Sequence, residues 1–205
     1  VVTGVQTCAL PISEIRWGNR FLLNMQTPEG FLMRSLGFGE YKESDNRWTD
    51  NRIMSGDERH IQTEPADLTG QLNFILAQLQ VARIFAAEDH AYASLCGNAA
   101  IQCYEWTRNR ELKRIGEKAL MLRISCALYR LTGDKKFRRQ SRNDLQALLD
   151  HKQHDEATGI IFFGTEFRGN LSTYGSSWVV AALEDFRSTY PDSPLVVDAR
   201  TWLAF

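Results

Sequence analysis

Three residues whose types suit ligand binding lie close together in a long polar stretch of the chain. Trp48 is followed by Asp50 and Arg52, so an aromatic ring and two charged side chains share one short segment. An aromatic ring can stack on the face of a sugar, while charged side chains hydrogen-bond its hydroxyl groups. A second aromatic pair, Tyr174 and Trp178, lies where another polar stretch meets a helix-like one. These residue types in polar loops favour contact with a sugar or another ligand.

Acidic residues and histidines also form small groups, but neither group has the spacing of a known metal site. Calcium prefers several oxygen ligands, and four acidic residues share the first polar stretch without EF-hand spacing: Asp45, Asp50, Asp57 and Glu58. His151 and His154 could present two zinc ligands, but no third ligand motif accompanies them. The sequence contains no nucleophile elbow and no phosphate loop in a strand-to-helix context. We therefore predict no metal and no cofactor.

The composition is that of an ordinary folded chain without a strong charge bias. Of 205 residues, 43% are hydrophobic and 24% are charged, and the net charge of −1 indicates no basic surface for nucleic acid. No apolar run approaches the roughly 18 residues of a membrane span. Cys96 and Cys103 are about 10 Å apart along a predicted helix, too far for a disulfide. We interpret both, and Cys126, as core residues.

The first thirteen residues do not fit the pattern of the rest of the chain. They contain no Lys or Arg, and Pro11 interrupts their only apolar patch, so they do not form a secretory signal peptide. Residues 2–12 resemble the translation of a sequencing-library adapter. We therefore expect residues 1–13 to be non-native and residues 14–205 to be an internal piece of a longer domain. We expect the parent to be secreted or periplasmic, although its localisation is not readable from this stretch.

Hydrophobic periodicity predicts a mostly helical chain. Apolar residues recur at helix spacing in about seven segments: 14–25, 66–87, 89–108, 111–131, 134–152, 176–188 and 194–205. The polar stretches 34–65 and 154–174 are expected to be long loops, the second with a short strand at residues 160–163. The predicted fold class is therefore all-α, with little strand.

A weak internal repeat links these helices. Asp89 and Asp134 each follow the end of one helix and are expected to cap the next, and Gly133 is expected to end a helix. Asp192 follows a third helix end in a similar context. Each copy indicates an αα-hairpin of about 45 residues, and such hairpins bury their apolar faces on their neighbours. They can form an open solenoid or a closed toroid, and the long aromatic-bearing loops favour a toroid with a cleft.

Three segments, in this order, resemble glycoside hydrolase family 9. Residues 14–30, EIRWGNRFLLNMQTPEG, are similar to the family pattern D-E-I-R-W-x-x-x-F-L-L-K-M-Q-x-x-D-G. Residues 66–93 are similar to its A-A-R-x-[FY] stretch followed by D-x-x-[YF]-A. Residues 127–137, ALYRLTGDKKF, are similar to A-E-L-Y-x-A-T-G-D-x-x-Y.

The resemblance implies a fold and a reaction. The family's fold is an (α/α)6 toroid, twelve helices paired as six hairpins with the cleft at one end, so this chain would supply part of it. The family's reaction is inverting hydrolysis of β-1,4-glucan, in which one carboxyl group activates water and another protonates the leaving oxygen. The family's base lies in a D-A-G-D motif upstream of the E-I-R-W helix, and its acid lies near the end of the domain. No D-A-G-D motif occurs here, so we assign no catalytic residue and expect residues 1–205 to be inactive.

The resemblance also implies where the substrate would bind. Trp48, with Asp50 and Arg52 beside it, lies in the loop that helps line the family's cleft. Tyr174 and Trp178 lie at the mouth of a later helix, where Trp178 could also pack in the core. We predict these five as substrate-binding residues and a polysaccharide or oligosaccharide as the partner, with no nucleic acid and no membrane.

Two alternatives remain. Other α/α-toroid sugar enzymes, such as an unsaturated-glucuronyl hydrolase or a sugar epimerase, share the hairpins but not the E-I-R-W stretch. A helical-repeat scaffold that binds protein partners would have even repeats with short turns, unlike the long loops predicted here. The sequence departs from the family pattern between Tyr41 and His60, and at Lys118 and Ala119, where an acidic pair is more usual.

Overall fold

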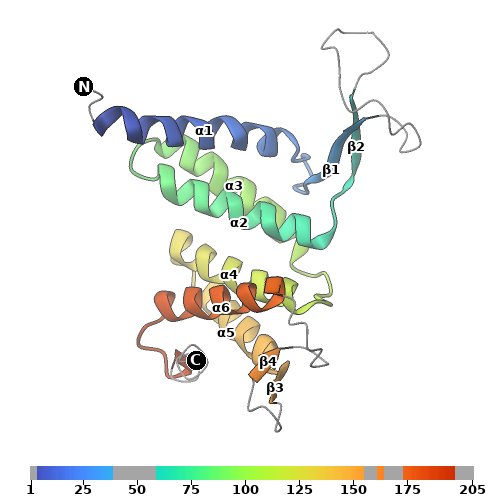
Figure 1. The fold of residues 1–205 in the computed structure, drawn as a ribbon, viewed down its shortest axis with the longest axis vertical. Coiled ribbons are helices and arrows are strands. Elements are labelled where there is room, and N and C mark those ends of the chain that lie inside the picture. The colour runs from blue at the N-terminus through green and yellow to red at the C-terminus, as the bar shows by residue number, and fades with distance from the viewer. Residues whose placement is uncertain (1–3, 39–58, 155–160, 164–172, 197–205) are drawn as a thin grey trace.

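The computed structural model describes residues 4–38, 59–154, 161–163 and 173–196. Within these ranges the chain forms six α-helices and two small antiparallel sheets (Figure 1). The helices are α1 Gly4–Asn24, α2 Leu68–Phe85, α3 His90–Thr107, α4 Ile115–Thr132, α5 Lys135–Leu149 and α6 Thr173–Thr189. The strands are β1 Met33–Phe38, β2 Arg59–Pro65, β3 Lys152–His154 and β4 Ile161–Phe163.

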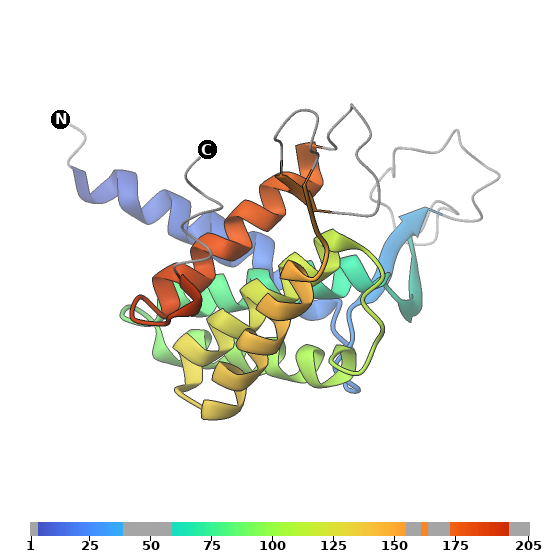
Figure 2. The same cartoon turned by 90° about the horizontal axis from the view of Figure 1, so that it is seen from below.

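The helices form an inner and an outer layer that alternate along the chain. Helices α2, α4 and α6 pack on one another in that order, and α3 and α5 pack on the outside of α2 and α4. Figures 1 and 2 show that α2, α4 and α6 begin at the same end of the molecule. Helix α1 contacts both α2 and α3. This arrangement confirms the predicted all-α fold class, a partial (α/α) toroid with little strand.

The two predicted αα-hairpins, α2–α3 and α4–α5, are confirmed with the caps that the sequence indicates. The Asp89 carboxylate accepts a hydrogen bond from the Tyr92 backbone N–H, and Asp134 accepts one from Lys136. Gly133 ends α4 in the left-handed conformation, with φ of 68°, which glycine adopts without steric cost. In the third repeat the Leu195 N–H meets the Ser193 hydroxyl rather than Asp192, so the capping position lies one residue later.

Apolar side chains between the layers form three buried clusters. One joins α2, α3 and α4, a second joins α4, α5 and α6, and a third lies where α1 meets α2 and α3. Cys96, Cys103 and Cys126 are free and completely buried, which confirms them as core residues. Burial also raises the pKa of the Cys103 and Cys126 thiols to about 12, so neither forms a thiolate near neutral pH.

The structure corrects the prediction that residues 34–65 form one long loop. The two ends of this stretch form β1 and β2, which pair antiparallel with Leu36 opposite Ile61 and Phe38 opposite Arg59. The pairing joins residues more than twenty positions apart, which a local search for periodicity does not detect. The short strand predicted at residues 160–163 is confirmed as β4, which pairs with β3.

Helix ends differ from the prediction at several places. Helix α1 starts at Gly4, so it runs continuously across the predicted boundary between residues 13 and 14, and Ile12 packs on the third cluster. The origin of residues 1–13 stays a prediction. The helix predicted from residue 194 has helical residues at 195 and 196 and otherwise lies outside the described residues. Within the described ranges, none of the helices is both long and apolar enough to cross a membrane.

Candidate functional site

The connections of the two layers differ strongly between the two ends of the molecule. The sheet β1–β2, residues 108–114 and the sheet β3–β4 lie at the end where α2, α4 and α6 begin, which we name the loop end (Figure 1). Short turns at residues 86–89, 133–134 and 190–193 lie at the opposite, turn end. Long connections at one end of a rigid helical scaffold are where binding residues usually lie, so the loop end is the candidate site.

Gln71 of α2 holds the start of the first loop-end connection. Its side chain is completely buried, its amide nitrogen donates to the Leu32 carbonyl at 2.8 Å, and its oxygen accepts from the Leu32 N–H at 2.8 Å. The thiol of Cys103 on α3 donates to the same oxygen at 3.2 Å. One side chain thus ties the residue before β1 to both helices of the first hairpin.

Gln26 and Gly30 fix the turn that precedes β1. The Gln26 side-chain nitrogen donates to the carbonyls of Gly30 at 2.8 Å and of Ala99 on α3 at 2.9 Å. Gly30 has φ of 100°, and a Cβ atom there would lie 2.9 Å from the Gln102 carbonyl oxygen. Only glycine fits this close approach, so residues 26–32 have a defined position against α3.

Glu117 organises the second connection. It is buried in the first turn of α4, and its carboxylate accepts from the backbone N–H groups of Lys113 at 2.9 Å and Arg114 at 3.0 Å. The hydroxyl of Thr69 on α2 lies 3.4 Å from the other carboxylate oxygen. Because these groups are all donors to Glu117, this carboxylate caps α4 and links it to the start of α2.

Trp178 lies where α4 and α6 meet at the loop end. Its ring lies directly on Gly116, where a Cβ atom would come within 2.5 Å of the ring, and it packs on both large core clusters. The side chain is half-buried. This position sets the spacing between two inner helices, and a contact of Trp178 with substrate stays a prediction.

Of the other four predicted site residues, the structure describes the position of one. Tyr174 lies in the first turn of α6, which begins at the loop end. Trp48, Asp50 and Arg52 lie outside the described residues. The strands on either side of their segment are paired, with Phe38 opposite Arg59, so the residues that flank the segment lie side by side at the loop end.

Sequence analysis missed an aromatic group at the loop end. The rings of Phe31, in the turn before β1, and Trp106, near the end of α3, have centroids 5.2 Å apart. The Arg110 guanidinium carbon lies 3.9 Å from the centroid of the Trp106 ring, a cation–π distance. The spacing of Trp106 and Arg110, four residues apart at a helix end, is the sequence signal that could have indicated this contact.

The described part of the loop end has the composition of a binding surface. It combines half-buried aromatic rings with charged side chains, and its connections are fixed by buried polar groups. Among the described residues there is no group of three or more His, Cys, Asp or Glu side chains that could hold a metal ion. Glu117, the buried carboxylate at this end, is occupied by two backbone N–H groups.

Alternating inner and outer helices with long connections at one end define the class of α/α-toroid proteins. A family model described as glycosyl hydrolase family 9 matches residues 6–157, most of the chain. The chain therefore belongs to glycoside hydrolase family 9, as the sequence resemblance indicates. The match begins inside the segment predicted to be adapter-derived. The searches of the curated proteins and of the solved structures gave no match.

Proposed function

We propose that the parent protein hydrolyses β-1,4-glucan or a related plant-type polysaccharide, and that the loop end carries part of its substrate cleft. Membership of family 9 is the observation on which this proposal depends. The arrangement of the loop end supports it, because three inner helices begin there and their connections carry aromatic and charged residues. Trp48 would stack on a sugar ring, and Asp50 and Arg52 would hydrogen-bond its hydroxyl groups.

The proposed reaction is inverting hydrolysis, which needs two carboxyl groups on opposite sides of the scissile bond, far enough apart to admit a water. The sequence contains no D-A-G-D motif to supply the base. Glu117 is a poor candidate for either role, because its carboxylate already accepts from Lys113, Arg114 and Thr69. We therefore expect both catalytic carboxyl groups outside these 205 residues and no turnover by the chain itself.

A count of helices supports the proposal that the chain is part of a larger toroid. The described residues form six helices, whereas the closed toroid implied by the resemblance has twelve. Trp17 and Phe21 of α1 are 75% and 50% exposed, which is unusual for a large apolar pair on a helix. Further helices of the toroid would cover such surfaces.

Family membership also favours one of the alternatives. A sugar epimerase or an unsaturated-glucuronyl hydrolase would share the hairpins without matching family 9, and a protein-binding scaffold would have short turns at both ends. The long connections of the loop end and the family match both favour the glycoside hydrolase.

Binding to insoluble cellulose tests the proposed cleft. The chain should sediment with cellulose, and Trp48→Ala should reduce the bound fraction several-fold, because the stacking ring is lost. Trp17→Ala is the matched control, since Trp17 is exposed within α1 rather than in a loop-end connection, and it should leave the bound fraction unchanged. Equal binding by wild type and Trp48→Ala would count against the cleft assignment.

Sequencing the genomic DNA upstream of the Glu14 codon tests the proposed reaction. A D-A-G-D motif within about one helical hairpin of Glu14 would supply the base. The extended protein should then hydrolyse β-glucan and release the product of inverted configuration, which NMR of the fresh reducing end detects. Measurable turnover by residues 1–205 alone would refute the placement of the catalytic groups.

A further inference from the structure

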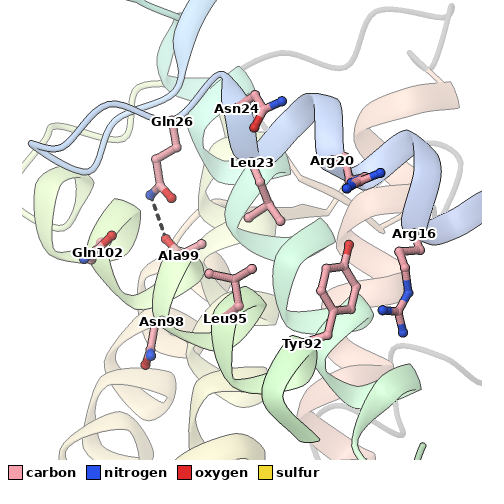
Figure 3. A pocket seen from close by; sticks show the side chains of 10 residues that line it. All are labelled: Arg16, Arg20, Leu23, Asn24, Gln26, Tyr92, Leu95, Asn98, Ala99 and Gln102. Atoms are coloured by element: carbon pink, nitrogen blue, oxygen red, sulfur yellow. Dashed lines mark hydrogen bonds between the residues drawn. The ribbon is translucent and has the colours of Figure 1, made fainter. Parts of the chain in front are cut away.

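A groove of about 840 Å³ runs between α1 and α3, and its Gln26 end adjoins the turn that precedes β1 (Figure 3). This volume lies within the usual range of small-ligand sites. Figure 3 shows Leu23 and Leu95 in the middle of the groove, Gln26 and Gln102 toward one end, and Arg16 with Tyr92 toward the other. Since Tyr92 and Gln102 are ten residues apart on one helix, the groove is about 15 Å long.

The polar side chains that line the groove are mainly carboxamides. They come from both sides: Asn24 and Gln26 from the α1 side, and Asn98 and Gln102 from α3. Each carboxamide is both a donor and an acceptor of hydrogen bonds, as a sugar hydroxyl is. Gln26 is fixed by its bonds to Gly30 and Ala99, so this end of the groove has a defined geometry before any ligand arrives.

Among the described residues, the uncompensated charge that lines the groove is positive and belongs to Arg20. Arg16 and Arg20 line it, and no Asp or Glu is among its lining residues. Arg16 is held at its end of the groove by Asp89, at 2.8 Å, and its guanidinium lies over the rings of Phe85 and Tyr92. Arg20 is exposed and makes no ion pair with any described carboxylate. Arg20 can therefore receive an anionic group in a two-pronged contact, as guanidinium groups do with carboxylates.

The floor of the groove is apolar. Leu95 is 53% exposed there although it is a large hydrophobic residue, and Leu23 and Ala99 lie beside it. A pyranose ring has hydroxyl groups at its edge and C–H groups on its faces, so it matches carboxamide walls around an apolar floor. An acidic peptide would also pair with the arginines and would hydrogen-bond the carboxamides through its backbone, so the apolar floor, which matches the C–H face of a pyranose ring, is what favours the sugar.

From this juxtaposition we propose that the groove between α1 and α3 binds a short acidic oligosaccharide. A uronic-acid carboxylate would pair with Arg20, the hydroxyl groups would hydrogen-bond Asn24, Asn98 and Gln102, and a sugar face would lie on Leu95. The site shares Gln26 with the turn before β1 but lies along α1 and α3, and its binding needs neither hydrolysis nor Trp48. The inference therefore stands or fails independently of the proposed reaction.

Calorimetric titration of the full chain with trigalacturonate at low salt tests the proposal. Binding should weaken roughly ten-fold in Arg20→Ala, because a charge-assisted contact is lost. Gln102→Ala should weaken it by a smaller factor. Arg139→Ala is the matched control, since Arg139 is exposed on α5 far from the groove in sequence and should leave binding unchanged. Trp48→Ala should also leave it unchanged, which separates this site from the cleft.

Three further ligands make the proposal falsifiable. Cellotriose has the hydroxyl groups without the carboxylates, and triglutamate has the carboxylates without the sugar rings. Both should bind at least several-fold more weakly than trigalacturonate. Equal binding of cellotriose would refute the charge argument, and equal binding of triglutamate would identify the groove as a peptide site instead. No binding of trigalacturonate, or equal loss in Arg139→Ala, would overturn the proposal, as would equal competition by acetate.

Discussion

The helix caps at the turn end are local, although Asp89 there also pairs with the distant Arg16, whereas the side chains that fix the loop end reach across the chain. At the turn end, Asp134 caps α5 through the N–H of Lys136, two residues away. At the loop end, Gln71 hydrogen-bonds Leu32 across 39 residues, and Glu117 reaches Thr69 across 48. Local contacts form as each helix forms, whereas the long-range contacts need the packed hairpins. We therefore expect substitutions at the loop end to cost more stability and to disturb the proposed cleft.

The largest effect in this comparison should follow loss of the Gln71 amide. Gln71→Leu keeps the size of the side chain but removes the acceptor of the Leu32 N–H and one of the two donors to the Leu32 C=O, which also accepts from the Ala66 N–H. Removing two hydrogen bonds from a largely buried group should lower the free energy of unfolding by about 3 kcal/mol. Urea denaturation measures it. Asn73→Leu is the control, since Asn73 is exposed on the same helix and should change stability by less than about 0.5 kcal/mol.

The contact of Trp178 with Gly116 should give the next largest effect. In Gly116→Ala the new methyl group would lie within 2.5 Å of the ring, so α4 and α6 must separate or the ring must turn. Overpacking of this kind should lower the free energy of unfolding by about 2 kcal/mol. Gly18→Ala provides the contrast, because open space surrounds Gly18 inside α1.

The sign of the change in the free energy of unfolding in the two glycine variants shows whether the Trp178 ring is fixed against Gly116. Gly18→Ala should stabilise the chain by about 0.5–1 kcal/mol, since alanine has the higher helix propensity. If Gly116→Ala also stabilised the chain, Trp178 would not be fixed against α4. Its ring would then be free for the substrate contact that the sequence predicts.

The buried carboxyl group of Asp144 should make the stability of the protein depend on pH. Asp144 on α5 is 8% exposed, one of its oxygens accepts from Gln140 at 2.8 Å, and the other has no partner among the described residues. Burial raises the pKa of this carboxyl to about 6, against the lowering effects of Gln140 and of the nearby Ser125 hydroxyl. The folded state therefore holds the proton more tightly than the unfolded chain, and ionised Asp144 destabilises the fold.

Asp144→Asn should thus stabilise the protein at every pH above the unfolded pKa, because there folding must either take up a proton or bury the charge. The gain should reach about 1–2 kcal/mol above pH 6 and should vanish as the pH falls below the unfolded pKa of 3.8. Urea denaturation of both proteins at several pH values measures it. A gain that does not change with pH would contradict the ionisation argument and would indicate a packing effect instead.

The difference between local and long-range contacts also explains which features of the fold the sequence could predict. Six of the seven predicted helices, the caps at Asp89 and Asp134, and the end of α4 at Gly133 follow rules that involve a few neighbouring residues and are confirmed, while the helix predicted at 194–205 lies mostly outside the described residues. The pairing of β1 with β2 and the buried role of Gln71 depend on distant residues meeting, and no local pattern indicates them.

The candidate site was predicted less completely than the fold, for a related reason. A single aromatic residue near a helix start, such as Trp178, fits both a binding role and a core role, and only its neighbours distinguish the two. The structure shows that the neighbour is Gly116, a residue 62 positions earlier in the chain. Phe31 and Trp106 were missed because their ring contact also joins distant segments.

The smallest predicted effect concerns the turn end and the weak internal repeat. Asp134→Ala removes a single local cap and should lower the free energy of unfolding by about 1 kcal/mol. Asp192 occupies the matching place in the third copy, but the Leu195 N–H meets the Ser193 hydroxyl instead. Asp192→Ala should therefore leave stability unchanged within about 0.3 kcal/mol, while Ser193→Ala should lower it measurably. Thermal denaturation of the three variants side by side measures these differences. If Asp192→Ala cost as much as Asp134→Ala, the third copy would use the same cap as the first two, and the repeat would be regular at the turn end.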